Sequence, residues 1–175
     1  MLNIFIGSHG TGKSLLVKAL RNEIPSYTSD GFSRPIHECE SLSVFQRQAV
    51  INRLTLWAFK NYLEVNINVF SARSIIDAII YTELLFPDLS DEKKEEIGLK
   101  DLYENLSLLK SKNIRFFYIP IEFKFVDDGV RYSEVLQKKI DEKILSFIRK
   151  NNIYTSLITG SIEERKEKVL KLINS

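Results

Sequence analysis

The stretch GSHGTGKS, from Gly7 to Ser14, decides the fold of this chain. It carries glycine, lysine and serine at every fixed position of the pattern G-x-x-x-x-G-K-[ST]. The apolar run LNIFI precedes it at residues 2–6, which is typical of a strand buried on both faces. The segment KSLLVKALRNEI at residues 13–24 predicts a helix that ends before Pro25. The motif therefore lies at a turn from a buried strand into a helix.

Further strands and helices alternate along the rest of the chain. The predicted strands are SYTSD (26–30), NINVFSA (66–72), RFFYIPI (115–121) and TSLIT (155–159). The predicted helices are a long one opened by the capping box of Ser43 and Gln46, SIIDAIIYTELLF (74–86), one helix from Ser90 to about Lys112, VLQKKIDEKILSFIRKN (135–151) and a last one capped by Ser161 and Glu164. GFSRPIHECES (31–41) is expected to be a polar loop. Strands joined by helical crossovers predict an α/β fold, a parallel sheet with helices on both faces.

The composition is that of one globular domain. The chain has 175 residues, and 25 basic against 23 acidic residues leave a net charge of +2, which does not favour nucleic-acid binding. The single cysteine, Cys39, excludes an internal disulfide and is expected to be a buried free thiol. No apolar run approaches the roughly 18 residues of a membrane span. We therefore expect a soluble, cytoplasmic protein that does not enter a membrane.

The residues of GSHGTGKS are suited to binding a polyphosphate. Backbone N–H groups of such a loop can surround phosphate oxygens, while its glycines allow close approach and the helix N-terminus favours an anion. Lys13 would reach the β- and γ-phosphates, and the Ser14 hydroxyl would ligate magnesium. His9 is expected to be a solvent-exposed spacer. The motif predicts ATP and Mg²⁺ as cofactors, with an ATP-binding set of Gly7, Ser8, His9, Gly10, Thr11, Gly12, Lys13 and Ser14; the alternative is a glycine-rich structural turn.

Charged residues follow each of the other strands, at the edge of the sheet where ligands of such folds gather. They are Asp30 with Arg34, Arg73 with Asp77, the segment DDGVR from Asp127 to Arg131, and Gly160 with Ser161. Each has a structural explanation alone, since turn residues and helical i,i+4 ion pairs are common. Together they favour function, because a carboxylate can accept the proton of an attacking hydroxyl and arginines neutralise a transferring phosphoryl group.

The order GxxGTGKS, DGxSR, RSxxDxxxY, DDGVR and TGSxEER resembles the small P-loop kinases of the ribosylnicotinamide-kinase-like and deoxynucleoside-kinase-like group, especially phage and bacterial members known as AAA-type ATPases. A high content of Lys, Asn and Ile also suits an AT-rich phage genome. The resemblance covers nearly the whole chain. It implies one P-loop kinase-like domain over residues 1–175 with the three-layer P-loop NTPase fold, a five-stranded parallel sheet of order 2-3-1-4-5.

The resemblance also implies roles for the charged residues. The implied catalytic residues are Lys13, Asp30 as general base, Arg73 of the motif after the third strand, and Arg131 as a lid arginine over the phosphates. Arg34, Asp77 and Asp128 are assigned to the acceptor, and Gly160 with Ser161 to the loop beside adenine. In the relatives an acidic residue usually precedes the motif arginine and helps to hold magnesium, but here Ala72 stands in that place.

The missing carboxylate leaves three functions open. The first is a kinase that transfers the γ-phosphate of ATP to a hydroxyl or phosphate of a nucleoside- or nucleotide-type acceptor, with magnesium held by Ser14, phosphates and water, supported by Asp77 or Glu122. The second is a polynucleotide-type kinase acting on a 5′-hydroxyl or hydroxymethylated base in DNA. The third is a P-loop ATPase or nucleotide-dependent switch. Trp57 and Tyr62 could stack a base but are expected in the core, and the oligomeric state is left open.

Overall fold

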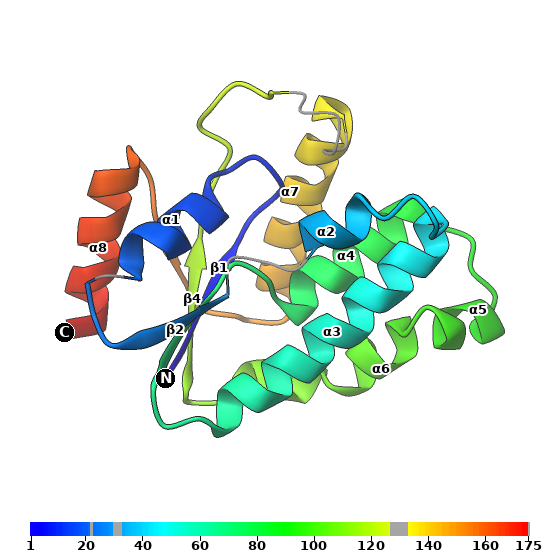
Figure 1. Ribbon diagram of the computed structural model, residues 1–175, viewed down its shortest axis with the longest axis horizontal. Coiled ribbons are helices and arrows are strands. Elements are labelled where there is room, and N and C mark those ends of the chain that lie inside the picture. The colour runs from blue at the N-terminus through cyan, green and yellow to red at the C-terminus, as the bar shows by residue number, and fades with distance from the viewer. Residues whose placement is uncertain (22, 30–32, 127–132, 175) are drawn as a thin grey trace.

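The computed structural model describes residues 1–21, 23–29, 33–126 and 133–174 (Figure 1). Its strands are β1 (Leu2–Ile6), β2 (Ser26–Ser29), β3 (Asn68–Ser71), β4 (Ile114–Tyr118) and β5 (Thr155–Leu157). Its helices are α1 (Lys13–Leu20), α2 (Ser33–His37), α3 (Val44–Glu64), α4 (Ile75–Leu85), α5 (Asp91–Glu96), α6 (Leu99–Glu104), the 3-10 helix η1 (Leu106–Lys110), α7 (Glu134–Lys150) and α8 (Ile162–Asn174).

The five strands form one parallel sheet in the order β2-β3-β1-β4-β5, which confirms the expected fold class. β1 lies at the centre, where Leu2 pairs with Val69 of β3 on one side and with Ile114 of β4 on the other. All five residues of β1 are buried, as its continuous apolar run predicts. Because the strands are parallel, their carboxyl ends meet at one edge, and the turn after β1 lies in the middle of that edge.

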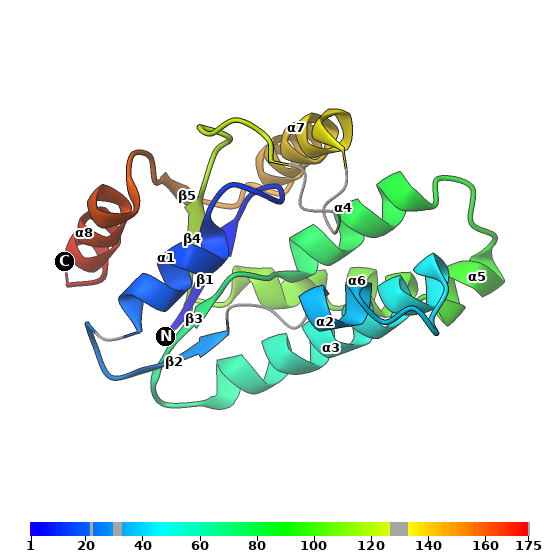
Figure 2. The same ribbon diagram turned by 45° about the horizontal axis from the view of Figure 1, so that its top comes forward.

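Helices cover both faces of the sheet (Figures 1 and 2). On one face, α1 and α8 pack over Phe5, which stacks on Phe117 with ring centroids 5.3 Å apart. On the other face, α3, α4, α6 and α7 cover Ile4 and Ile6. Neighbouring residues of β1 thus supply two separate apolar clusters, because successive side chains of a strand point to opposite faces. None of the described helices is both long and apolar enough to cross a membrane.

Several local predictions are wrong. The single helix expected from Ser90 to Lys112 is divided into α5, α6 and η1. Gly98, in a left-handed conformation at φ +75°, separates α5 from α6, and Asn105 lies between α6 and η1. The short helix α2 lies inside the expected polar loop. Trp57 is 65% exposed, on the outer face of α3, whereas Tyr62 packs against the core as expected. Cys39 is only partly buried, with its Sγ 3.2 Å from Ser41 Oγ.

Candidate functional site

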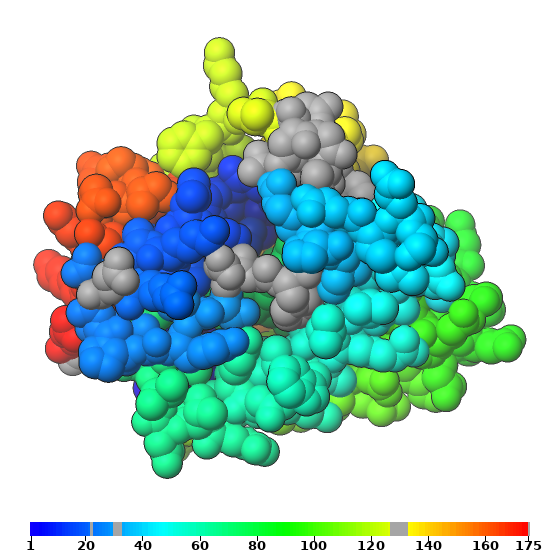
Figure 3. All heavy atoms as spheres, in the orientation of Figure 1, coloured from blue at the N-terminus to red at the C-terminus, as the bar shows by residue number. Residues whose placement is uncertain are grey.

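The loop between β1 and α1 has a conformation that requires its glycines. Gly7, Gly10 and Gly12 have φ angles of +152°, +76° and +92°. A Cβ atom on Gly7 would lie 2.3 Å from the carbonyl oxygen of Ile119, so no other residue fits there without movement of the backbone. Gly12 is the N-cap of α1, which places the positive end of the helix dipole at the end of the loop. Figure 3 shows this blue N-terminal part of the chain beside the segment around α2.

The carbonyl groups of the loop are held by side chains. Thr11 Oγ1 donates to Ser8 O at 3.0 Å, and Gln137 Nε2 donates to His9 O at 2.6 Å. Lys13 Nζ donates to Gly7 O and Ser8 O at 2.5 and 2.6 Å. Because C=O and N–H of a trans peptide point in opposite directions, the bond from Gln137 turns the Gly10 N–H away from α7. The loop is thereby arranged to present backbone donors to an anion.

Lys13 lies at the centre of a buried group of charges. Its side chain is 9% exposed, and burial lowers its pKa to about 8. Asp77 and Asp141 partly offset this effect, whereas Arg73 adds to it. Burial raises the pKa of Asp77, although Lys13, the Ser74 hydroxyl and Arg73 favour its charged form. Asp77 Oδ2 accepts a hydrogen bond of 2.7 Å from Ser74 Oγ at the start of α4. The structure therefore brings predicted residues of the first and third strand ends into one electrostatic group.

Arg73 connects the end of β3 to α2. Its guanidinium donates a hydrogen bond to Ser33 Oγ, the first residue of α2. Two small cavities, each about 10 Å³, adjoin Arg73; one is also lined by His37 and Asp77, the other by Ser29 and Tyr62. Such a volume holds about one water molecule. Burial, together with Arg73 and Arg47, lowers the pKa of His37, so this side of Arg73 favours a neutral imidazole.

Other predicted residues lie elsewhere. Arg34, on α2, is 55% exposed in its side chain and lies 3.9 Å from Glu38 in an i,i+4 ion pair. His9 is not the solvent-exposed spacer that was expected, since its N–H and Nδ1 both lie 3.0 Å from the Tyr81 hydroxyl of α4. Ser14 is exposed in the first turn of α1. Asp30, Asp128 and Arg131 lie outside the described residues.

The loop after β5 is connected to the phosphate-binding loop through Glu122 and Arg165. The Gly160 N–H donates to Glu122 Oε2 at 2.9 Å, and Ser161 with Glu164 forms the expected cap of α8. Burial alone would raise the pKa of Glu122, but the hydrogen bonds from Arg165 and Gly160 outweigh it and lower that pKa. The Glu122 carboxylate thus accepts hydrogen bonds from protein donors, which does not favour its expected role in helping to hold magnesium.

Sequence reasoning missed three polar residues beside the loop: Gln137, Asp141 and Arg165. Gln137 and Asp141 lie one turn apart on α7, next to the apolar stripe of Ile140 and Ile144. Asp141 Oδ2 accepts a 2.7 Å hydrogen bond from Tyr118, and burial raises its pKa against the opposing effects of Tyr118, Ser8 and Lys13. For Gln137 and Asp141, the available sequence signal is the i,i+4 spacing of two polar residues beside an apolar stripe.

The protein side chains at this site fit magnesium only if a nucleotide and water supply the other ligands of the metal. No cluster of three or more His, Cys, Asp or Glu side chains able to hold a metal occurs within the ranges that the structure covers. Ser14 offers one hydroxyl oxygen. Mg²⁺ commonly keeps several waters and takes phosphate oxygens as ligands, so the Ser14 hydroxyl fits as one protein ligand when a nucleotide and water supply the others.

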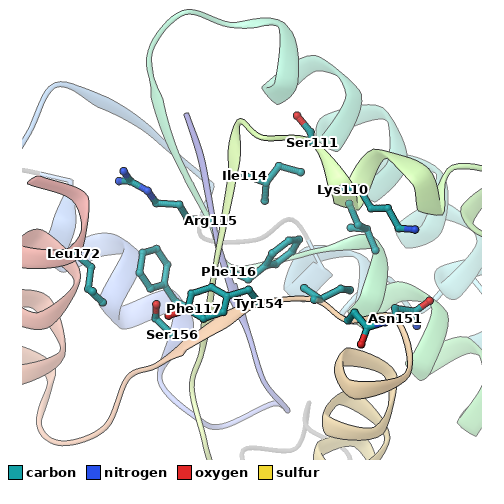
Figure 4. A pocket seen from close by; sticks show the side chains of 13 residues that line it. Lys110, Ser111, Ile114, Arg115, Phe116, Phe117, Asn151, Tyr154, Ser156 and Leu172 are labelled. Atoms are coloured by element: carbon teal, nitrogen blue, oxygen red, sulfur yellow. The ribbon is translucent and has the colours of Figure 1, made fainter. Parts of the chain in front are cut away.

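A broad hollow of about 640 Å³ lies at the opposite end of the sheet, beside the first residues of β4 (Figure 4). Its floor is apolar, with Ile114 and Phe116, and Tyr154 borders it. Lys110 and Arg115 point in opposite directions in Figure 4, and Arg115 donates to Ile173 O at 3.1 Å. Its size suits a ligand, but polar groups do not converge there, whereas at the β1–α1 loop they do. The loop is the better candidate for the functional site.

Comparison with known proteins places the chain among P-loop proteins. The pattern of a family described as AAA domain matches residues 3–165, whereas no curated protein sequence matches the chain. Among solved structures, deoxyadenosine kinase from M. mycoides, with the products dCMP and dCDP bound, has a TM-score of 0.72 at 13% identity, covering 99% of both chains.

Two further structures are similar in fold. The NadR protein in complex with NR has a TM-score of 0.73 at 19% identity; 99% of this chain matches 50% of that one. Thymidylate kinase from Candida albicans has a TM-score of 0.64 at 17% identity, with 99% of this chain and 90% of that chain covered. At such low identities these similarities establish the fold. Since the family pattern spans most of the sequence, this chain belongs to the AAA domain family.

Proposed function

We propose that this protein is an ATP-dependent kinase that transfers the γ-phosphate of ATP to a hydroxyl or phosphate group of a nucleoside- or nucleotide-type acceptor. The observation that carries the proposal is the loop after β1, whose carbonyls are bound by side chains while Lys13 and Arg73 lie beside it. Similar folds occur in deoxyadenosine kinase and thymidylate kinase, which supports an acceptor of this class. Residues 1–175 would act as one P-loop kinase domain.

In the proposed reaction, an acceptor oxygen attacks the γ-phosphorus, the bond to the β–γ bridging oxygen breaks, and ADP leaves. Asp30 is proposed to take the proton of the acceptor hydroxyl. Lys13 would bind the β- and γ-phosphates, and Arg73 with Arg131 would neutralise charge on the transferring group. Ser14 would hold Mg²⁺, which neutralises phosphate charge when bound.

The remaining proposed roles concern binding of the adenine of ATP and binding of the acceptor. Gly160 and Ser161 are proposed to lie beside adenine, and Arg34, Asp77 and Asp128 to bind the acceptor. DNA is a less favoured acceptor because the net charge is close to zero.

One observation favours a second candidate, a P-loop ATPase or switch. Ala72 ends the third strand region with a side chain that is 2% exposed and packed in the apolar cluster under α1. No carboxylate therefore stands at that position to assist with the metal. An ATPase would pass the γ-phosphate to water, so the destination of the phosphate separates the two candidates.

The test is incubation of the purified protein with magnesium and γ-labelled ATP against nucleosides, nucleoside monophosphates, nicotinamide riboside, and DNA with free 5′ or hydroxymethyl-base hydroxyls. Lys13→Ala should abolish ATP binding, whereas Asp30→Asn should retain ATP affinity and lose transfer steeply. Asp88→Asn, at an exposed position between α4 and α5, is the matched control and should retain both. Label found only in inorganic phosphate would contradict the kinase and favour the ATPase. Equal loss of binding and transfer in Asp30→Asn would contradict its role as base.

A further inference from the structure

Arg165 is a fully buried charged residue behind the phosphate-binding loop. It comes from the first turns of α8, 154 residues from the loop residue that it contacts, and its exposed fraction is 0%. Burying a guanidinium is costly unless its hydrogen bonds are made. Its Nε has no partner among the described residues, so burying this side chain costs more than burying an apolar one of similar size. Its two terminal nitrogens both have partners, and these partners indicate a function.

The first partner is the loop itself. Arg165 NH1 donates to Thr11 O at 2.6 Å, and NH1 would lie 3.2 Å from a Cβ atom built on Gly12. The Thr11 carbonyl and the Gly12 N–H belong to one peptide unit, in which they point in opposite directions. A guanidinium that binds the carbonyl from the α8 side therefore turns the Gly12 N–H away from α8, toward the side where the proposed nucleotide phosphates would bind. Gly12 adopts φ +92°, and because glycine has wide conformational freedom, the hydrogen bond from Arg165 restricts the orientations open to this peptide.

The second partner connects this peptide to the loop after β5. Arg165 NH2 donates to Glu122 Oε2 at 2.6 Å, and the same oxygen accepts the Gly160 N–H at 2.9 Å. The guanidinium carbon lies 5.1 Å from the centroid of the Phe123 ring, which covers it by a cation–π contact. Three segments, the β1–α1 loop, the segment after β4 and the loop after β5, are thus joined through the side chains of Arg165 and Glu122.

We propose that Arg165 is a positioning residue for nucleotide binding: it orients the Thr11–Gly12 peptide toward the phosphates and links it through Glu122 to the Gly160 loop. This inference rests on the proposed function, since it assigns the residue that prepares the same loop for ATP. Arg165 does not touch the nucleotide in this assignment. Charge-assisted hydrogen bonds of this geometry are the strong ones, which suits a restraint that must hold one peptide in place.

The test compares Arg165→Met, Arg165→Lys and Glu122→Gln with the matched control Arg115→Met. Arg115 is a partly buried arginine that, like Arg165, donates to a backbone carbonyl; its acceptor is Ile173 O of α8, at the other end of the sheet. The first measurement is the Kd for ATP. Loss of a charge-assisted hydrogen bond predicts an increase of about ten- to hundredfold in Arg165→Met, a smaller increase in Glu122→Gln and partial rescue in Arg165→Lys. Arg115→Met should leave the Kd unchanged while lowering the Tm.

The second measurement needs no nucleotide. The ¹H–¹⁵N heteronuclear NOE of Gly12 should fall in Arg165→Met, because the peptide loses its restraint, and should stay unchanged in Arg115→Met. Glu122→Gln keeps the measurement available if Arg165→Met does not fold, since Glu122 is 30% exposed in its side chain. An unchanged Gly12 NOE in the Arg165 and Glu122 variants would overturn the inference.

The two measurements separate this inference from the proposed function. If the NOE falls but the unsubstituted protein binds no ATP, the proposed function fails while the restraint on the loop stands. If the unsubstituted protein binds ATP and the Kd of Arg165→Met equals that of Arg115→Met, the inference fails while the proposed function stands.

Discussion

Raising the pH from 7 to 9 should weaken ATP binding about tenfold through Lys13. Burial lowers the pKa of this lysine to about 8, so its charged form falls from about nine-tenths of the molecules at pH 7 to about one-tenth at pH 9. Phosphate groups favour the charged form, so binding must restore the proton above pH 8. The penalty is about 1.4 kcal/mol between these two pH values. At pH 7 and below most of the lysine is already protonated, so this term is close to zero.

The assay is isothermal titration with ATP in buffers of different ionisation enthalpy, which reports both the Kd and the protons taken up. The terminal phosphate of a nucleotide titrates near pH 6 and contributes little above pH 8. Lys13→Arg is the matched control, because a guanidinium stays charged throughout this range, so its Kd should not change between pH 7 and 9 even if its affinity is lower. The reasoning is refuted if the unsubstituted protein shows no decline above pH 8, or if Lys13→Arg shows the same tenfold decline.

Two substitutions test the backbone and the end of the third strand. Gly7→Ala should lower the free energy of unfolding, measured by urea denaturation, by about 1–3 kcal/mol. The reason is that the added Cβ would lie 2.3 Å from Ile119 O. Gly98→Ala, whose Cβ has its nearest neighbour at 3.6 Å, should cost less, and equal losses would contradict the argument. Ala72→Asp should also destabilise the protein, since an unpaired carboxylate would enter the apolar cluster around Phe5. Restoration of its Tm by magnesium and ATP together, but by neither alone, would instead show that this strand end reaches the metal.

The residues that sequence reasoning missed all reach the loop from distant parts of the chain. Gln137 contacts His9 across 128 residues, and Arg165 contacts Thr11 across 154. Periodicity predicts the helices that carry them, but it does not say which helix will pack beside the loop. Arg165 even belongs to the motif TGSxEER, yet only its full burial and its two hydrogen bonds distinguish it from the neighbouring charged residues of α8.

Local patterns were also insufficient where packing overrides them. Trp57 lies in a helix rich in apolar residues, and its aromatic character favoured the core, but α3 turns it outward to 65% exposure. The long helix expected after Ser90 fails at Gly98, where one residue in a left-handed conformation separates α5 from α6. The pattern predicts His9 as a spacer because a loop of this kind binds phosphate with backbone donors at that position. Its contact with Tyr81 of α4, 72 residues away, has no signal in the neighbouring sequence.

The sequence by itself determined the order of the strands and of the main helices, and the place of the phosphate-binding loop, because buried strands, helix caps and glycine turns are encoded by neighbouring residues. The order of the strands within the sheet was predicted by the family resemblance. The tertiary structure decided which side chains hold that loop, the burial that lowers the pKa of Lys13, and the placement of Arg165 behind Gly12. The bonds from Gln137 and Arg165 to the loop, and the electrostatic effect of Asp77 on Lys13, connect segments more than 60 residues apart, and no local pattern specifies them.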